Sequence, residues 1–204
     1  MIQPRPQAAF FDYGGVLAEE GYHQGLLAIA ARHHLPGDAF FATVTEIIYG
    51  CGFVTGHTDE HHFWHLVREE TGISGSDAEL TNEILSRFVL RPRMITAVQA
   101  LRQQGLKVLI LSDQTDWLER LDRRDHFFAE FDQVCNSFRM GKTKRDASLF
   151  GDVATRFQMA PEAALFIDDN PGHIERATAQ GWQTHRFTSE DAFFADLTRR
   201  QLWP

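Results

Sequence analysis

Polar residues directly follow several short apolar runs of this 204-residue sequence, namely Asp12, Ser112 and the pair Asp168 and Asp169. A carboxylate is a competent covalent nucleophile, and carboxylate oxygens are the ligands that Mg²⁺ prefers in proteins. Three carboxylates and a hydroxyl that met in one place would need a compensating cation. Such a cation is either a hard metal ion such as Mg²⁺ or a lysine.

The apolar runs before these residues are typical of buried β-strands. Strong runs cover residues 8–11, 106–111 and 163–167, and weaker ones cover 131–135 and 183–187. Their apolar residues do not alternate with polar ones, as expected for strands that are buried on both faces of a parallel sheet. Because the carboxyl ends of parallel strands share one edge, where ligands bind, we expect the polar residues above to converge there.

Amphipathic helical segments fill most of the gaps between these strands, over residues 94–101, 149–157 and 174–177. The strand–helix–strand order predicts an α/β fold with a doubly wound parallel sheet. Residues 19–91 interrupt this order, because their apolar residues recur at helical spacing and Ser76 with Glu79 forms a capping box. We therefore predict an α/β core of residues 1–18 and 92–204, with a helical insertion at 19–91.

The composition indicates a soluble protein that binds neither nucleic acid nor membrane. The chain has 20 Lys and Arg against 28 Asp and Glu, so its net charge is −8, and it lacks a dense basic patch. No run approaches the ~18 apolar residues that cross a bilayer. Two distant cysteines, Cys51 and Cys135, suggest a reducing compartment, so we expect a cytoplasmic protein.

Four segments together resemble the motifs of the haloacid dehalogenase superfamily of phosphatases. In chain order they are FFDYGGVL with Asp12, LILSD with Ser112, GKTKRDASLF with Lys144, and FIDDNPGHIERA with Asp168 and Asp169. Their order and spacing agree with that superfamily over nearly the whole chain. The resemblance implies a Rossmann-like core, and the insertion at 19–91 lies where the superfamily carries a helical cap.

The resemblance also implies a mechanism, in which Asp12 attacks phosphorus and water hydrolyses the aspartyl-phosphate. Mg²⁺ would take an oxygen of Asp12, the backbone carbonyl of Gly14 and Asp169, while Asp168 would hold a metal-bound water. A small phosphorylated metabolite would be the substrate.

Two further residues are implied by the resemblance as phosphate ligands. Ser112 and Lys144 would bind the phosphate oxygens, and Lys144 would also offset the carboxylate cluster, so it counts as catalytic. Asp113 stands where the superfamily often has asparagine, and we include it among the phosphate-pocket residues. A carboxylate at that place would repel phosphate unless its side chain turns away. The first and fourth motifs and the small cap look like those of sugar-phosphate phosphatases that act on glucose 1-phosphate.

The first motif departs from the typical phosphatase at Gly14, where an acidic residue serves as general acid and base. We therefore expect a preference for aryl over alkyl phosphates, because an aryl group leaves without much protonation. Arg145 replaces the usual proline after Lys144. Two alternatives stay open: a 2-haloacid dehalogenase that uses Asp12 without metal, and a catalytically silent binding or regulatory protein. The oligomeric state is left open.

Histidines at four-residue spacing, His57, His61 and His65, lie in the insertion. Zinc binding is one interpretation of such spacing on a helix. No paired cysteines accompany them, so we favour a surface that faces solvent or substrate. His173, in the fourth motif, is expected at most to support a ligand.

Overall fold

The computed structural model describes residues 4–203. Its centre is a five-stranded sheet in the order β3-β2-β1-β4-β5, in which every neighbouring pair is parallel. The strands are β1 (Ala8–Phe11), β2 (Lys107–Ser112), β3 (Gln133–Asn136), β4 (Ala164–Asp168) and β5 (Gln183–Arg186). The α/β fold class with a doubly wound parallel sheet is therefore confirmed.

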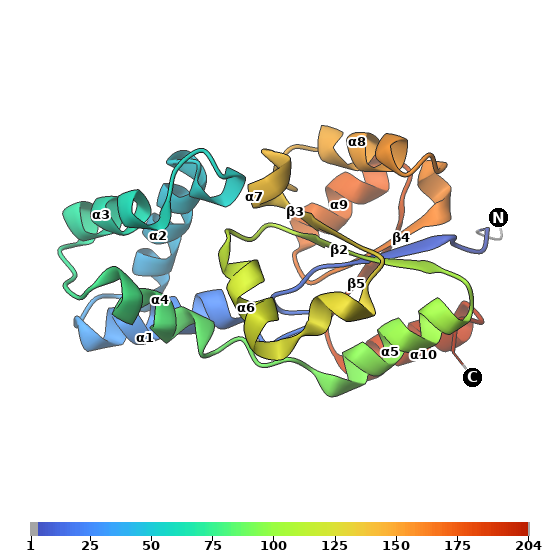
Figure 1. The fold of residues 1–204 in the computed structure, drawn as a ribbon, viewed down its shortest axis with the longest axis horizontal. Coiled ribbons are helices and arrows are strands. Elements are labelled where there is room, and N and C mark those ends of the chain that lie inside the picture. Colours follow the sequence, from blue (N-terminus) through green and yellow to red (C-terminus); the bar gives the residue numbers. More distant parts are fainter. Residues whose placement is uncertain (1–3, 204) are drawn as a thin grey trace.

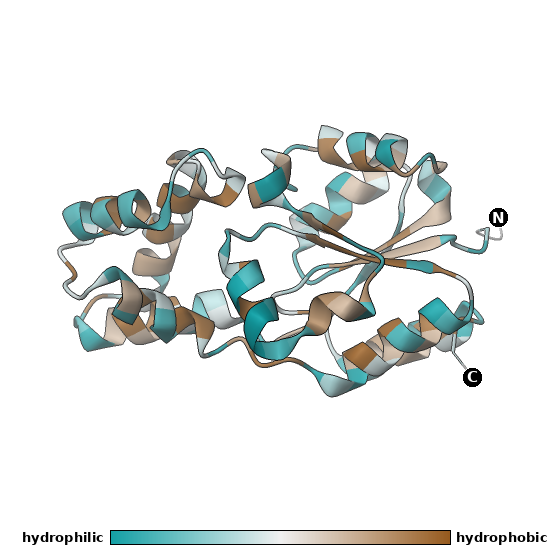
Figure 2. Ribbon diagram, in the orientation of Figure 1, coloured by the Kyte–Doolittle hydropathy of each residue, from teal (hydrophilic) through white to brown (hydrophobic). Residues whose placement is uncertain are grey.

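Helices cover both faces of this sheet (Figure 1). Alternate residues of β1 belong to the apolar clusters on opposite faces. Phe11 belongs to the apolar cluster that includes residues of α5 (Pro92–Gln103), α6 (Trp117–Asp125) and α10 (Glu190–Arg199). Phe10 belongs to the cluster that includes residues of α8 (Ser148–Arg156) and α9 (Pro171–Ala179). The hydrophobic strands lie between helices whose hydrophilic residues are on the outside (Figure 2).

Shorter helical turns complete the α/β part of the chain. They are η2 (Phe127–Glu130), α7 (Ser137–Met140) and η3 (Pro161–Ala163). The loop between α7 and α8 carries the third motif. Its conformation therefore decides where Lys144 lies.

The helices between β1 and α5 form a separate group beside the carboxyl edge of the sheet (Figure 1). They are α1 (Gly21–Arg32), α2 (Gly37–Gly50), η1 (Phe53–Thr55), α3 (Glu60–Thr71) and α4 (Asp77–Leu85). The capping box of Ser76 and Glu79 is present at the start of α4, as the sequence predicts. The two linking segments run side by side, with Glu19 N donating to the Val89 carbonyl at 2.9 Å. We call residues 19–91 the cap.

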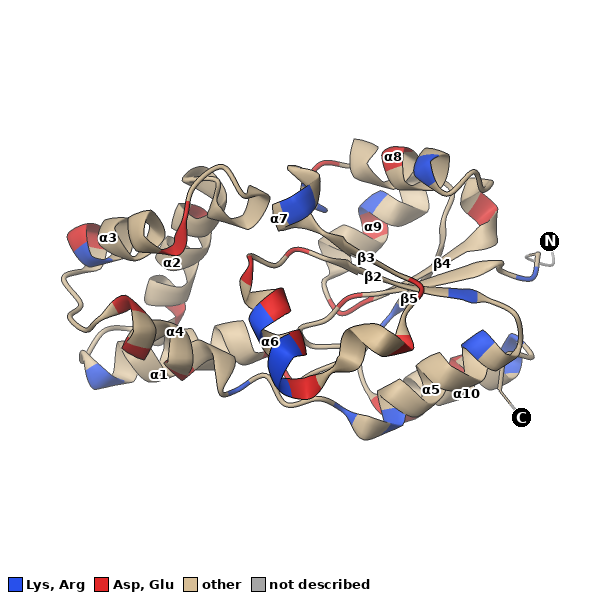
Figure 3. Ribbon diagram, in the orientation of Figure 1, with Lys and Arg blue, Asp and Glu red and all other residues tan. Residues whose placement is uncertain are grey.

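Charged residues of both signs are interspersed along the ribbon of the cap and the core (Figure 3). Many of the arginines are paired with a nearby acid, as Arg120 is with Glu60 at 3.0 Å. Within the described part of the chain, none of the helices has both the length and the apolar character needed to cross a membrane.

Candidate active site

The register of the central strands brings Asp12, Asp168 and Ser112 to the same edge of the sheet. Phe11 of β1 pairs with Ile167 of β4, and the Asp12 N–H continues this ladder by donating to the Ile167 carbonyl at 2.9 Å. Asp12 and Asp168 therefore leave neighbouring strands side by side. Ser112 ends β2 on the other side of β1, and its hydroxyl donates to Asp12 Oδ1 at 2.6 Å. The predicted convergence of these three residues is observed.

Lys144 bridges the two aspartates from the loop between α7 and α8. Its Nζ lies 2.9 Å from Asp12 Oδ2 and 2.6 Å from Asp168 Oδ2, and its side chain is completely buried. The loop is fixed from two sides, because Arg176 Nε donates to the Lys144 carbonyl at 2.7 Å and Asp113 accepts from the Lys144 N–H at 2.9 Å. The structure thus places Lys144 beside the nucleophile position, as the resemblance implies.

Asp113 has contacts that explain how an acid can follow Ser112. Besides the Lys144 N–H, its carboxylate accepts a hydrogen bond from the hydroxyl of Tyr49 at 3.0 Å. Tyr49 lies on α2 of the cap, and the guanidinium of Arg145 covers its ring at 3.6 Å from the ring centre. Asp113 therefore connects the cap to the Lys144 loop. Two of the residues that depart from the superfamily pattern, Asp113 and Arg145, contact the same cap tyrosine.

Burial and neighbouring charges shift the pKa values of this group in different directions. Burial raises the pKa of Asp12 well above its usual value, and the nearby Asp168 and Asp169 add to this although Lys144 opposes it. Burial alone would raise the pKa of Asp168, but Lys144 and His173 bring it down to about 2. Burial disfavours the Lys144 ammonium, yet Asp12 and Asp168 raise its pKa above the usual value. Lys144 and Asp168 therefore form a permanently charged pair.

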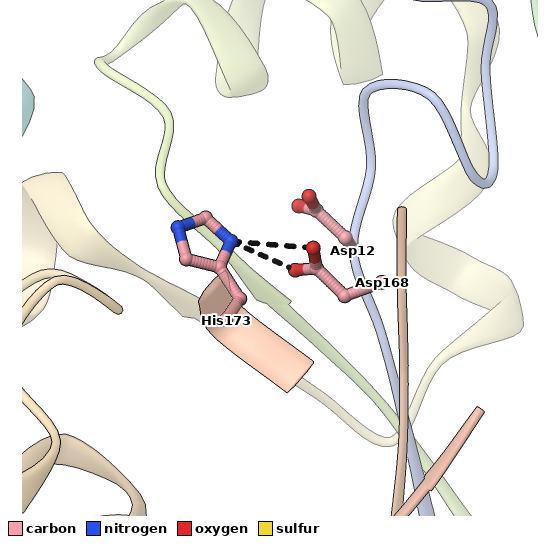
Figure 4. A group of neighbouring side chains, drawn as sticks. All are labelled: Asp12, Asp168 and His173. Carbon is pink, nitrogen blue, oxygen red and sulfur yellow. Dashed lines mark hydrogen bonds and ion pairs between the residues drawn. The ribbon is translucent and has the colours of Figure 1, made fainter. Parts of the chain in front are cut away.

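His173 lies closer to the centre than its expected supporting role suggests. It belongs to α9, and its Nδ1 is 3.2 Å from both carboxylate oxygens of Asp168 (Figure 4). Asp12, Asp168 and His173 each offer one ligand atom within 4.8 Å of the others. The sequence signal was available, because His173 lies in the first turn of the helix that follows the two aspartates.

Asp169 lies outside this compact group, although it lines a cavity that Asp12 and His173 also line. Its carboxylate packs against Gly15, whose φ is +74°, and a β-carbon at position 15 would overlap with it. No side chain among residues 4–203 donates a hydrogen bond to Asp169, and burial followed by the charge of Asp168 raises its pKa. The charges of Lys144 and His173 oppose this rise, but Asp169 forms no salt bridge with a side chain of the described residues.

The donor set fits a hard divalent cation. Asp12, Asp168, Asp169 and the carbonyl of Gly14 offer only oxygen, the donor type that Mg²⁺ prefers, and Lys144 alone bridges this set of carboxylates. Burial raises the pKa values of Asp12 and Asp169 even though the charge of Lys144 opposes it, and a divalent cation would stabilise both carboxylates. Asp12, Gly14 and Asp169 all line one cavity that a cation could enter.

This cavity has a volume of about 510 Å³ and lies between the cap and the carboxyl edge of the sheet. Its core wall includes Asp12, Lys144 and Asp169. Its cap wall is rich in aromatic and apolar residues, including Tyr22, Phe41, Ile48 and Tyr49. Glu20, which precedes α1, also lines it.

Sequence reasoning overlooked Glu20 as a member of the site. Burial raises the pKa of its carboxyl group to about 7. The available signal was its place at the start of the predicted helical insertion, where an acid can cap a helix N-terminus.

The cap histidines are not part of the cavity. His61 Nδ1 is 2.8 Å from Asp77 Oδ2 and His65 Nε2 is 3.4 Å from Glu69 Oε1, while His57 is exposed beside Thr55. None of the three histidines lines the cavity, and none joins a metal-like group among the residues described. The solvent-facing surface expected for these histidines is therefore observed.

Residues 6–181 match the protein family described as haloacid dehalogenase-like hydrolase. The chain belongs to this hydrolase family. It is also 29% identical to the haloacetate dehalogenase H-2 of Moraxella sp. (strain B) over 145 residues, which are 70% of this chain and 57% of that protein. The chain thus aligns with little more than half the length of this relative.

Solved structures of two kinds resemble this hydrolase. A HAD family enzyme of Bacteroides thetaiotaomicron in complex with magnesium and inorganic phosphate has a TM-score of 0.71 and 19% identity, over 91% of this chain and 96% of that one. The L-2-haloacid dehalogenase of Xanthobacter autotrophicus, with chloropropionic acid covalently bound, has a TM-score of 0.64 and 19% identity. This match covers 98% of this chain and 85% of that one. At these identities the likeness establishes the fold, and the chemistry has to be argued from the site.

Proposed function

We propose that this hydrolase is a Mg²⁺-dependent phosphatase that acts on a small phosphorylated metabolite through an aspartyl-phosphate on Asp12. One observation carries the proposal. The Asp12 carboxylate lies against the buried Lys144 ammonium at 2.9 Å, while Asp169, in the same cavity, forms no salt bridge with a described side chain. Such a site suits an anionic substrate only when a cation accompanies it.

The residues of the chain have distinct tasks in this reaction. A carboxylate oxygen of Asp12 attacks phosphorus as the bond to the leaving oxygen breaks, and water later releases phosphate from Asp12. Lys144 and Ser112 bind phosphate oxygens, and the Ser112 hydroxyl also orients Asp12. Asp12, Asp169 and the Gly14 carbonyl would hold Mg²⁺, with Asp168 adjacent, and the ion would neutralise part of the phosphate charge.

The cavity supports a metabolite of moderate size as the substrate. Its volume of about 510 Å³ lies within the range of small-molecule sites. Aromatic residues of the cap face the charged core wall across it. We propose a sugar phosphate, in line with the resemblance of the motifs to the phosphatases that act on glucose 1-phosphate.

Dehalogenation of a 2-haloacid is the second candidate, because the curated relative and one of the similar structures carry that activity in their names. In that reaction Asp12 would attack carbon and displace halide without a metal ion. The Asp168–Asp169 pair argues against it, since a metal-free site gains nothing from an additional carboxylate that forms no salt bridge.

One assay separates the two chemistries. Purified protein is given a panel of phosphorylated metabolites and, separately, chloroacetate and 2-chloropropionate, each with Mg²⁺ or with EDTA. We expect phosphate release that requires Mg²⁺ and is lost in Asp12→Asn, a nearly isosteric change. Halide release in EDTA would instead establish the dehalogenase, and inactivity toward both panels would favour a silent binding protein.

A further inference from the structure

Gly14 lacks the side chain that would protonate a leaving group, but another acid reaches the same place. A β-carbon built on Gly14 would lie 2.9 Å from Oε2 of Glu20. The Glu20 carboxyl group therefore ends where a side chain at position 14 would begin. It does so on the wall of the cavity that also holds Asp12 and Lys144.

The local structure holds Glu20 in this orientation. Glu20 is the N-cap of α1, and its Oε1 accepts a hydrogen bond from the His23 N–H at 3.1 Å. Within the described part of the chain no side chain donates to its Oε2, the oxygen next to Gly14. The preceding residue, Glu19, turns elsewhere and pairs with Arg91 at 3.0 Å. One carboxyl oxygen thus anchors Glu20 and the other is available to a ligand.

Two other acid–base candidates of the cavity, His173 and Asp113, are already engaged. The Nδ1 of His173 faces Asp168 at 3.2 Å. The Asp113 carboxylate accepts from the Lys144 N–H and from the Tyr49 hydroxyl. Glu20 is the lining acid whose second oxygen lies beside the position that the missing residue would occupy.

We propose that Glu20 is the acid–base residue of this enzyme, in place of an acid at position 14; the proposal rests on the phosphatase function above. In the first step, Asp12 forms a bond to phosphorus and the bond from phosphorus to the leaving oxygen breaks. That oxygen takes the proton of the Glu20 carboxyl group and departs as an alcohol. In the second step, a water oxygen bonds to phosphorus, its proton passes to the Glu20 carboxylate, and the bond to Asp12 breaks.

The test compares Glu20→Gln with the matched control Glu19→Gln. Glutamine keeps an oxygen for the His23 N–H but cannot transfer a proton in this way. Substrates are p-nitrophenyl phosphate and an alkyl phosphate that the wild-type enzyme hydrolyses. A positioned acid–base group contributes roughly 10²- to 10⁴-fold. We expect the rate of alkyl-phosphate hydrolysis by Glu20→Gln to fall by about that factor. The rate of the p-nitrophenol burst should fall far less, and phosphorylated protein should accumulate. Glu19→Gln should keep both rates.

A double variant moves the acid from position 20 to position 14. In Glu20→Ala the space beside Gly14 opens, and Gly14→Asp added to it should recover a large part of the alkyl-phosphate rate. The backbone allows this change, because φ of Gly14 lies outside the left-handed region. The nearest remaining contact of the new β-carbon would be Phe88 Cε1 at 3.2 Å, which is tight. If Glu20→Gln does not fold, Glu20→Ser keeps a capping oxygen without an acid and serves as the second variant.

The outcomes separate the inference from the phosphatase function. If the wild-type enzyme releases no phosphate from any substrate, the phosphatase function fails and the role of Glu20 with it. If the wild-type enzyme is active and Glu20→Gln keeps its ratio of alkyl to aryl rates, only the role of Glu20 is refuted. A Glu20→Gln variant that needs more Mg²⁺ but keeps that ratio also refutes it, because Glu20 would then act on the metal ion.

Discussion

Replacing Lys144 with methionine tests the central claim that one buried ammonium holds the carboxylates of the site together. The Lys144 side chain is completely buried, and its Nζ contacts both Asp12 and Asp168. Methionine keeps most of the apolar stem and removes the charge. The variant then buries two adjacent carboxylates without a cation, close to Asp169.

The size of the effect follows from these contacts. Removing one partner of a buried ion pair costs about 3–5 kcal/mol, because an uncompensated charge stays behind. For a chain of this size, 1 kcal/mol corresponds to roughly 2–4 °C in Tm. We therefore expect Lys144→Met to unfold about 6–20 °C below the wild type at pH 7 in EDTA.

The pH dependence of this difference gives a second check. In the wild type, Lys144 and His173 hold the pKa of Asp168 at about 2, so this carboxylate stabilises the fold above its ordinary pKa near 4. In Lys144→Met the folded-state pKa of Asp168 rises above its unfolded value, and the pKa of Asp12, already raised in the wild type, rises further. Protons then bind the folded variant preferentially, and the difference in Tm should shrink between pH 7 and pH 5.

Thermal unfolding followed by circular dichroism measures both effects. The matched control is Lys142→Met, two residues away, where the lysine meets Asp152 at the surface. This control should leave Tm almost unchanged. A difference below 2 °C for Lys144→Met, or one that is independent of pH, would refute the reasoning that the ammonium compensates these carboxylates.

Three further changes test the cavity. Phe41→Ala, on the cap wall of the cavity, should alter the order of preferred phosphorylated substrates, whereas His61→Ala, outside the cavity, should not. Equal changes of substrate preference in both variants would contradict the assignment of Phe41 to the substrate cavity. Tyr49→Phe removes the 3.0 Å hydrogen bond from the cap to the core, worth about 1 kcal/mol, so KM should rise roughly fivefold with kcat nearly unchanged. Asp169→Ala should weaken the Mg²⁺ affinity measured by titration calorimetry more than Asp168→Ala does, because Asp168 is already paired with Lys144. The reverse order of affinities would assign the metal contact to Asp168.

Much of the fold follows from the sequence because the strands are buried on both faces. The continuous apolar runs place all five strands within two residues of their observed limits. Parallel pairing then forces the residues after β1, β2 and β4 to one edge, so the convergence of Asp12, Ser112 and Asp168 was predictable. The capping box at Ser76 and Glu79 was predictable because it depends only on local spacing.

Contacts across the cavity were not predictable in the same way. The hydrogen bond from Tyr49 to Asp113 joins residues 64 positions apart, and no local pattern sets the angle at which the cap meets the core. The position of Glu20 beside Gly14 depends on the turn between β1 and α1. The placement of Asp169 against Gly15, outside the group of Asp12 and Asp168, also depends on loop conformation.

The charge of Asp169 separates the two chemistries represented among the relatives. Its carboxylate is half-buried in a cavity whose substrate is an anion in either reaction. Without a metal ion, Asp169 repels a haloacid carboxylate, so Asp169→Ala would leave dehalogenation unchanged or faster. With Mg²⁺, the same carboxylate is a ligand that helps to neutralise phosphate, so the substitution slows phosphate release. The sign of this one effect therefore depends on which reaction the site catalyses, even though Asp12 would be the nucleophile in both.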